Sequence, residues 1–159
     1  MKKSLLIFTL VIALFLCACG SKESGGSKEK TVPAMKTIGE EAAAKREAPE
    51  EPILLNAEML DDETGIEEGM YSDYYYCISG NLDLRETIAV FKAKDGKAGE
   101  IEKLLKNKRE SLISEANNYN QKNYEMAMNG VVKTVDSTYV YMIISPNVSE
   151  IVKVMDKYF

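Results

Sequence analysis

The clearest pattern along the chain lies between residues 97 and 117, where apolar side chains recur at helical spacing. The stripe consists of Ala98, Ile101, Leu105, Leu112 and Ala116, and charged residues fill most of the positions between them. Apolar residues that are three, four or seven positions apart share one face of an α-helix. The pattern therefore predicts an amphipathic helix that packs with this face against a core.

The segments before this helix predict two β-strands. Residues 71–79 are rich in tyrosine, which favours extended structure. Residues 86–94 place apolar side chains on both faces of a strand, with Ile88 and Val90 on one face and Phe91 on the other. We therefore expect residues 86–94 to form a central strand of a sheet.

The segments after the long helix predict a β-hairpin and a terminal helix. Two apolar runs between residues 131 and 144 are separated by Asp136-Ser137-Thr138, a turn sequence. Asn147 is the expected N-cap of the last helix, and Glu150 three residues later completes a capping-box pattern.

Together these elements predict an α+β fold with two layers, a mainly antiparallel four-stranded sheet with two helices on one face. The domain is expected to span residues 53–159, a length that suffices for one core. Residues 53–70 add either a further helix or a segment along the edge of the sheet.

The first 18 residues have the layout of a bacterial secretion signal. Lys2 and Lys3 precede an apolar run over residues 5–18. As a helix with a rise of ~1.5 Å per residue, this run is too short to cross about 30 Å of hydrocarbon. We predict a cleaved signal peptide at residues 1–18, with an uncleaved anchor as the alternative.

Cys19 ends the sequence Leu16-Cys17-Ala18-Cys19, which resembles the lipobox of bacterial lipoproteins. The resemblance implies cleavage before Cys19 and attachment of lipid to its thiol. Two acyl chains hold a protein stably on a membrane. We therefore expect a protein that is lipid-anchored to the cell membrane, on its extracytoplasmic face, with the membrane as a partner through Cys19.

Residues 19–52 are expected to begin with the lipidated cysteine and to form a flexible, disordered tether. The segment has glycine and serine clusters and few large apolar residues, so it lacks the apolar side chains that a core requires. Residues 40–46 favour a helix, but an isolated helix of this length is marginal in water.

Charge and composition exclude several functions. The chain has 20 Lys and Arg against 25 Asp and Glu, and loss of Lys2 and Lys3 leaves 18 against 25, a net charge of −7. A negative protein gains no electrostatic affinity for nucleic acid, so no nucleic-acid partner is expected. The chain has no histidine, which excludes a Ser-His-Asp triad and the usual zinc sites. We therefore expect no enzymatic activity, no cofactor and no metal site, and Cys77 is expected to be a buried hydrophobic residue.

The acidic stretch over residues 58–73 leaves alternatives open. Its members are Glu58, Asp61, Asp62, Glu63, Glu67, Glu68 and Asp73. They could supply oxygen ligands to Ca²⁺, although the spacing does not fit an EF-hand, and a solvated loop is the favoured interpretation. Two of these acids could also face each other across a cleft in an enzyme that acts on cell-wall glycan.

The tyrosines at positions 71, 74, 75 and 76 are candidates for stacking on sugars or on a protein partner. Tyr74 and Tyr76 share one face of a strand and Tyr75 lies on the other. At least one of these faces is expected to belong to the core.

Residues 84–159 resemble a widespread domain of unknown function found in lipoproteins of low-GC Gram-positive bacteria. The resemblance rests on the strand Glu86-Thr87-Ile88-Ala89-Val90-Phe91-Lys92, the pair Lys108-Arg109, Tyr119, the segments Tyr139-Val140-Tyr141 and Ile143-Ile144-Ser145, and the short terminal helix. It implies secretion and this fold but no established activity, so it assigns no functional residue.

These observations lead to one functional expectation and one alternative. We expect a non-enzymatic, lipid-anchored binding or accessory domain at the cell envelope, with an envelope protein or a glycan as its partner. The alternative is a carboxylate-based enzyme that acts on cell-wall glycan.

Overall fold

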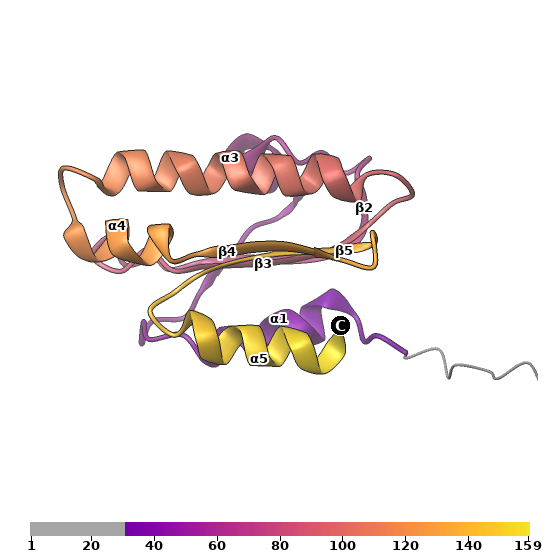
Figure 1. Cartoon of the computed structure of the whole chain (residues 1–159), viewed down its shortest axis with the longest axis horizontal. Helices are drawn as coiled ribbons and strands as arrows, with labels where there is room; N and C mark the ends of the chain where they lie inside the picture. Colours follow the sequence, from indigo (N-terminus) through magenta and orange to yellow (C-terminus); the bar gives the residue numbers. More distant parts are fainter. Residues whose placement is uncertain (1–30) are drawn as a thin grey trace, which may run out of the picture. The chain divides into compact units, whose positions relative to one another are not determined.

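A single open sheet of five antiparallel strands organises residues 31–159, which are the residues that the computed structural model describes (Figure 1). The strand order across the sheet is β1-β2-β3-β5-β4. The strands are β1 (Ile53–Leu54), β2 (Tyr71–Ile78), β3 (Thr87–Ala93), β4 (Val131–Val135) and β5 (Tyr139–Ile144). The predicted signal peptide and Cys19 lie outside the described residues.

The middle of the sheet consists of β3 and β5, which are apolar on both faces. Ala89 and Phe91 belong to the core on one side of the sheet. Ile88 and Val90 belong to the core on the other side. The prediction that residues 86–94 form a central strand is therefore confirmed, and β5 also pairs on both sides, with β3 and with β4.

Helices cover both faces of this sheet, which gives three layers where the sequence predicted two (Figure 1). One face carries α2 (Ala57–Thr64), α3 (Ala98–Ala116) and α4 (Gln121–Met128). The other face carries α1 (Met35–Ala43) and α5 (Val148–Tyr158). The α+β class is confirmed, but the expected four strands and two helices on one face are wrong. The physical reason lies in β3 and β5, whose apolar side chains on both faces need cover on both faces.

The long helix agrees with its prediction. It runs from Ala98 to Ala116 and buries Ile101 and Leu105 completely. Lys106 lies on its exposed face and pairs with Glu102 one turn earlier, at 2.6 Å. The amphipathic pattern thus identified both the helix and its buried side.

The folded unit begins earlier than residue 53. It runs from Val32 to Phe159. Within it, α1 buries Met35, Ile38 and Ala42 against the sheet. The expectation of a flexible tether up to residue 52 is therefore wrong from residue 32 onward, because these side chains find tertiary contacts that an isolated helix lacks. Residues 19–30 lie outside the described part.

The hairpin of β4 and β5 is confirmed, whereas the predicted cap of α5 is not. Val135 pairs with Tyr139 across the turn at residues 136–138. Asn147 precedes α5 but makes no side-chain cap hydrogen bond, and its amide donates instead to the carbonyl of Lys45 at 3.0 Å. Glu150 forms an ion pair with Lys153 at 2.7 Å rather than closing a capping box.

None of the helices formed by residues 31–159 has the length and apolar character needed to cross a membrane.

A polar cluster joins α1 to α5 on the surface. Glu41 accepts hydrogen bonds from the Tyr158 hydroxyl and from the Lys157 ammonium, the latter at 2.9 Å. The hydrogen bond from Tyr158, followed by that from Lys157, holds the pKa of Glu41 below its ordinary value of 4.5. This cluster links α1 to α5.

The cluster predicts a pH-dependent contribution to stability. Because the pKa of Glu41 is lower in the folded state, the ionised carboxylate stabilises the fold above pH 4.5, and this contribution disappears as the pH falls through the lowered pKa. We expect Glu41→Gln to melt below wild type at pH 7 and the gap to shrink at a second, acidic pH below 4.5. Tyr158→Phe should reproduce part of the effect. A gap that stays constant between the two pH values would contradict the prediction.

Candidate functional site

A groove opens at one end of the sheet, between the β2–β3 loop and the helices α3 and α4. Its first hollow has a volume of about 350 Å³ and its second of about 340 Å³. The two hollows adjoin, because Leu82, Arg85, Leu112 and Glu115 line both. We call the pair the loop groove, and its volumes lie at the lower end of the range of small-molecule sites.

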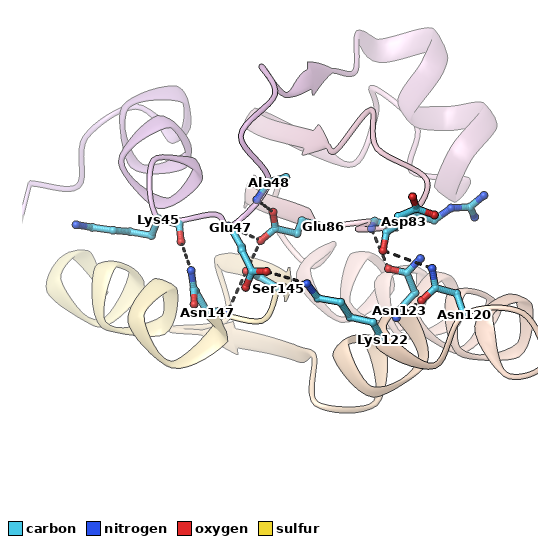
Figure 2. Close-up of polar contacts among 11 residues, drawn as sticks. Lys45, Glu47, Ala48, Asp83, Glu86, Asn120, Lys122, Asn123, Ser145 and Asn147 are labelled. Atoms are coloured by element: carbon cyan, nitrogen blue, oxygen red, sulfur yellow. Dashed lines mark hydrogen bonds and ion pairs between the residues drawn. The ribbon is translucent and has the colours of Figure 1, made fainter.

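Two asparagines at the start of α4 hold the loop in place. Asn120 caps α4 by accepting a hydrogen bond from the backbone N–H of Asn123 at 3.0 Å. The buried side chain of Asn123 then accepts from the N–H of Arg85 and donates to the carbonyl of Leu82, both at 3.0 Å. Figure 2 shows the Asn123 and Asn120 side chains beside Asp83 of the loop. The residues at the start of α4 therefore hold the β2–β3 loop in place, although the two segments are about 40 residues apart in the sequence.

The loop also stabilises its own shape. The side chain of Asn81 accepts from the N–H of Asp83 at 2.9 Å. The N–H of Asn81 donates to the hydroxyl of Ser79 at 3.1 Å. These short-range bonds are the turn contacts that asparagine and serine side chains typically make. Hydrogen bonds within the loop and hydrogen bonds from α4 thus both hold the wall of the groove in place.

The two cations that line the groove, Arg85 and Lys108, each form an ion pair. Arg85 lies 3.2 Å from Glu115 of α3. Lys108 of α3 lies 2.6 Å from Glu63 of α2, and its side chain is largely buried. Each cation in the groove therefore has an anion beside it.

Glu86 is a fully buried carboxylate at the second hollow of the groove. Figure 2 shows it beside Ala48 and Ser145. It accepts hydrogen bonds from the N–H groups of Glu47 and Ala48 at 3.0 and 2.7 Å, and from the hydroxyl of Ser145 at 2.5 Å. Such bonds offset the cost of burying the charge. Glu86 thereby attaches the segment after α1 to the sheet and to the end of β5, and it also lines the second hollow.

The four tyrosines proposed for stacking are mostly core residues. Tyr71, Tyr75 and Tyr76 are buried, and Tyr74 is half-buried with its hydroxyl donating to the carbonyl of Leu55 at 3.1 Å. Burial raises the pKa of Tyr76. These rings are not presented as a stacking surface.

Among the aromatic rings of residues 31–159, that of Tyr119 is the exposed one, in the turn between α3 and α4. This side chain is 91% exposed and lines the first hollow, where Leu82 is 71% exposed. The sequence pattern marked Tyr119 only as a residue that follows the long helix. The signal that could have identified it is its position among the asparagines at 117, 118 and 120, because such a polar turn seldom buries a ring.

Two of the acids of residues 58–73, Glu63 and Asp73, lie on different sides of the sheet. Glu63 pairs with Lys108 on the α3 side of the sheet. Asp73 accepts from the N–H of Met35, on the α1 side, at 2.8 Å. In residues 31–159, no group of three or more His, Cys, Asp or Glu side chains is placed to hold a metal ion.

Cys77 is buried, as the sequence predicts. Burial raises the pKa of its thiol. It belongs to the core between the sheet and the helices α1 and α5, so the thiol is shielded and in its protonated form at neutral pH.

Comparison with known proteins places the chain in a family without assigning it an activity. A search of curated proteins and a search of solved structures find no match. Residues 50–145 match the profile of a domain of unknown function, DUF4358. The predicted resemblance to a domain of unknown function is confirmed, but the match covers residues 50–145 rather than 84–159 and does not include the terminal helix. Because the match covers more than half of the chain, the protein belongs to the DUF4358 family.

Proposed function

We propose that this protein is a lipid-anchored, extracytoplasmic binding or accessory domain, and that it binds a cell-envelope protein or glycan in the loop groove. The observation that carries the proposal is the exposed rim of the groove. Leu82 and Tyr119 leave large apolar surface in water beside a polar hollow. Exposed apolar surface with a polar surround marks interaction sites.

The state of the charged groups favours binding over catalysis. The groove contains no histidine, and its cations Arg85 and Lys108 are neutralised by Glu115 and Glu63. A glycan-acting enzyme needs two carboxyl groups that flank the scissile bond. Of the acids in residues 58–73, Glu63 and Asp73 lie on opposite sides of the sheet, so these two do not form such a pair.

The proposed lipid anchor gives a testable prediction. Cys19→Ser removes the thiol that the lipobox-like sequence offers to lipid, so we expect the variant to be released from the membrane or to persist as an uncleaved precursor. Metabolic labelling with a palmitate analogue, followed by membrane fractionation, measures this. Cys77→Ser is the matched control and should keep the label. Equal labelling of wild type and Cys19→Ser would refute the proposed anchor.

The binding role is tested in intact cells by site-specific photo-crosslinking. A photo-reactive analogue of phenylalanine replaces Leu82 in the groove or, as the control, the exposed Lys153 on α5. We expect a defined adduct from position 82 and none from position 153. Absence of any adduct, or equal adducts from both positions, would overturn the proposed binding role.

A further inference from the structure

Tyr119 presents an aromatic ring to solvent at the rim of the loop groove. Among the large apolar side chains of residues 31–159 that are exposed, it has the highest exposed fraction, 91%. It follows α3 directly, and its N–H donates to the carbonyl of Ala116 at 3.1 Å. The ring therefore stands on a backbone that the end of the helix holds.

The wall beside this ring consists of planar polar groups. Asp83, Asn120 and Asn123 line the first hollow together with Tyr119. Asn120 uses one amide N–H for the carbonyl of Asp83, at 3.4 Å, and its oxygen for the N–H of Asn123. A side-chain amide offers two N–H donors and an oxygen with two lone pairs. Asn120 thus retains one donor and one acceptor position, which suits a ligand group that both donates and accepts.

The charges of the groove disfavour an ionic ligand. Arg85 and Glu115 form one ion pair, and Lys108 and Glu63 form another. An anionic ligand would have to displace Glu115 or Glu63 and would also meet the carboxylate of Asp83, which belongs to neither pair. A cationic ligand would have to displace Arg85 or Lys108 to reach the paired carboxylates, so among these acids only the exposed Asp83 would be directly open to it. A hydroxyl group can instead hydrogen-bond to either member of a pair without breaking it.

We propose that the loop groove binds an uncharged saccharide, with a sugar ring stacked on Tyr119 and its hydroxyl groups hydrogen-bonded to Asp83 and Asn120. A saccharide combines an apolar ring face with hydroxyl groups that donate and accept, which are the two properties that the groove offers. The two adjoining hollows, of about 350 and 340 Å³, accommodate an oligosaccharide that passes from one into the other. This inference rests on the proposed function and gives it a ligand class.

The test is isothermal titration calorimetry on the full chain, purified in detergent. The probes are uncharged tetrasaccharides of glucose and of N-acetylglucosamine, an anionic tetrasaccharide of galacturonic acid, and an uncharged tetrapeptide. We expect at least one uncharged tetrasaccharide to bind. Tyr119→Ala should weaken that binding about tenfold, whereas Tyr119→Phe should retain it, because the ring supplies the stacking energy. Tyr124→Ala, a change on α4 outside the lining of the groove, should bind as wild type does.

The outcomes separate this inference from the proposed function. Because Tyr119 is so exposed, Tyr119→Ala should melt as wild type does, and a lost affinity then reports on the groove. Tighter binding of the galacturonic acid probe or of the tetrapeptide would overturn the uncharged saccharide. A photo-adduct at position 82 without affinity for either uncharged probe would also overturn it and leave the proposed binding role standing. Absence of both the adduct and the affinity would overturn both the saccharide inference and the proposed binding role.

Discussion

Gly39→Ala is expected to detach α1 from the sheet and to lower the free energy of unfolding by about 3 kcal/mol or more. A Cβ atom at Gly39 would lie 2.1 Å from Cδ1 of Tyr75 and 2.7 Å from its Cβ. The ring could rotate, but its Cβ is fixed by β2, so the helix itself must move away. Overpacking of this kind typically costs about 1–3 kcal/mol and occasionally more. Movement of α1 also exposes Met35 and Ile38, which are fully buried or nearly so.

Gly99→Ala is the matched control for this prediction. Gly99 lies in α3, and a Cβ atom there would have no neighbour within 4 Å. Alanine in a helix restricts the unfolded chain more than glycine does, so this variant should be as stable as wild type or up to about 1 kcal/mol more stable. Thermal melts compare the two variants, and trypsin cleavage after Lys36 or Lys45 reports release of α1. Equal melting temperatures would mean that α1 does not pack as closely on β2 as the structure shows.

The sequence contains the apolar pattern of α1, but this pattern is short and gives only weak support for a packed helix. Met35, Ile38 and Ala42 follow one another at intervals of three and four residues, which is the spacing of a helical face. They lie beside Gly39 in an otherwise polar segment, so local composition favours disorder. The helix forms because the second face of β3 and β5 supplies an apolar surface. A central strand that is apolar on both faces was therefore the evidence for a third layer.

The candidate site was harder to predict than the fold. Strong periodic patterns identified α3, β3 and the hairpin of β4 and β5, because each pattern reports on its own segment. The groove depends on Asn123 reaching the carbonyl of Leu82, a contact between residues 41 positions apart. No local pattern contains that contact. The exposure of Tyr119 depends in the same way on how the turn after α3 is placed.

The pattern of the sequence does not predict the burial of Glu86 either. In sequence it stands between the exposed Arg85 and the apolar strand β3, where a charged residue is typically solvated. It is buried because the segment after α1 brings two backbone N–H groups to its carboxylate. Since that segment was expected to be part of a tether, the partners of Glu86 could not be predicted.

Glu86→Ala is expected to release the segment after α1 and to lower the free energy of unfolding by about 3 kcal/mol. The change leaves the N–H of Ala48, the N–H of Glu47 and the hydroxyl of Ser145 without their acceptor. A buried donor without a partner costs about 1–3 kcal/mol, and only the partly exposed N–H of Glu47 can turn readily to water. Glu86→Gln keeps one oxygen for Ala48 and should lose less stability.

Proteolysis and melting distinguish this local role from general destabilisation. In Glu86→Ala we expect trypsin to cleave after Lys45 and Arg46 faster than in wild type, at a temperature well below the midpoint of the thermal transition. Glu110→Ala is the matched control, because Glu110 is exposed and pairs with its neighbour Arg109 on the surface of α3, at 3.2 Å. Its effect should stay within about 0.5 kcal/mol. If Glu86→Ala and Glu110→Ala had the same melting temperature and the same rate of cleavage, the carboxylate of Glu86 would not be the group that holds the segment after α1 on the sheet.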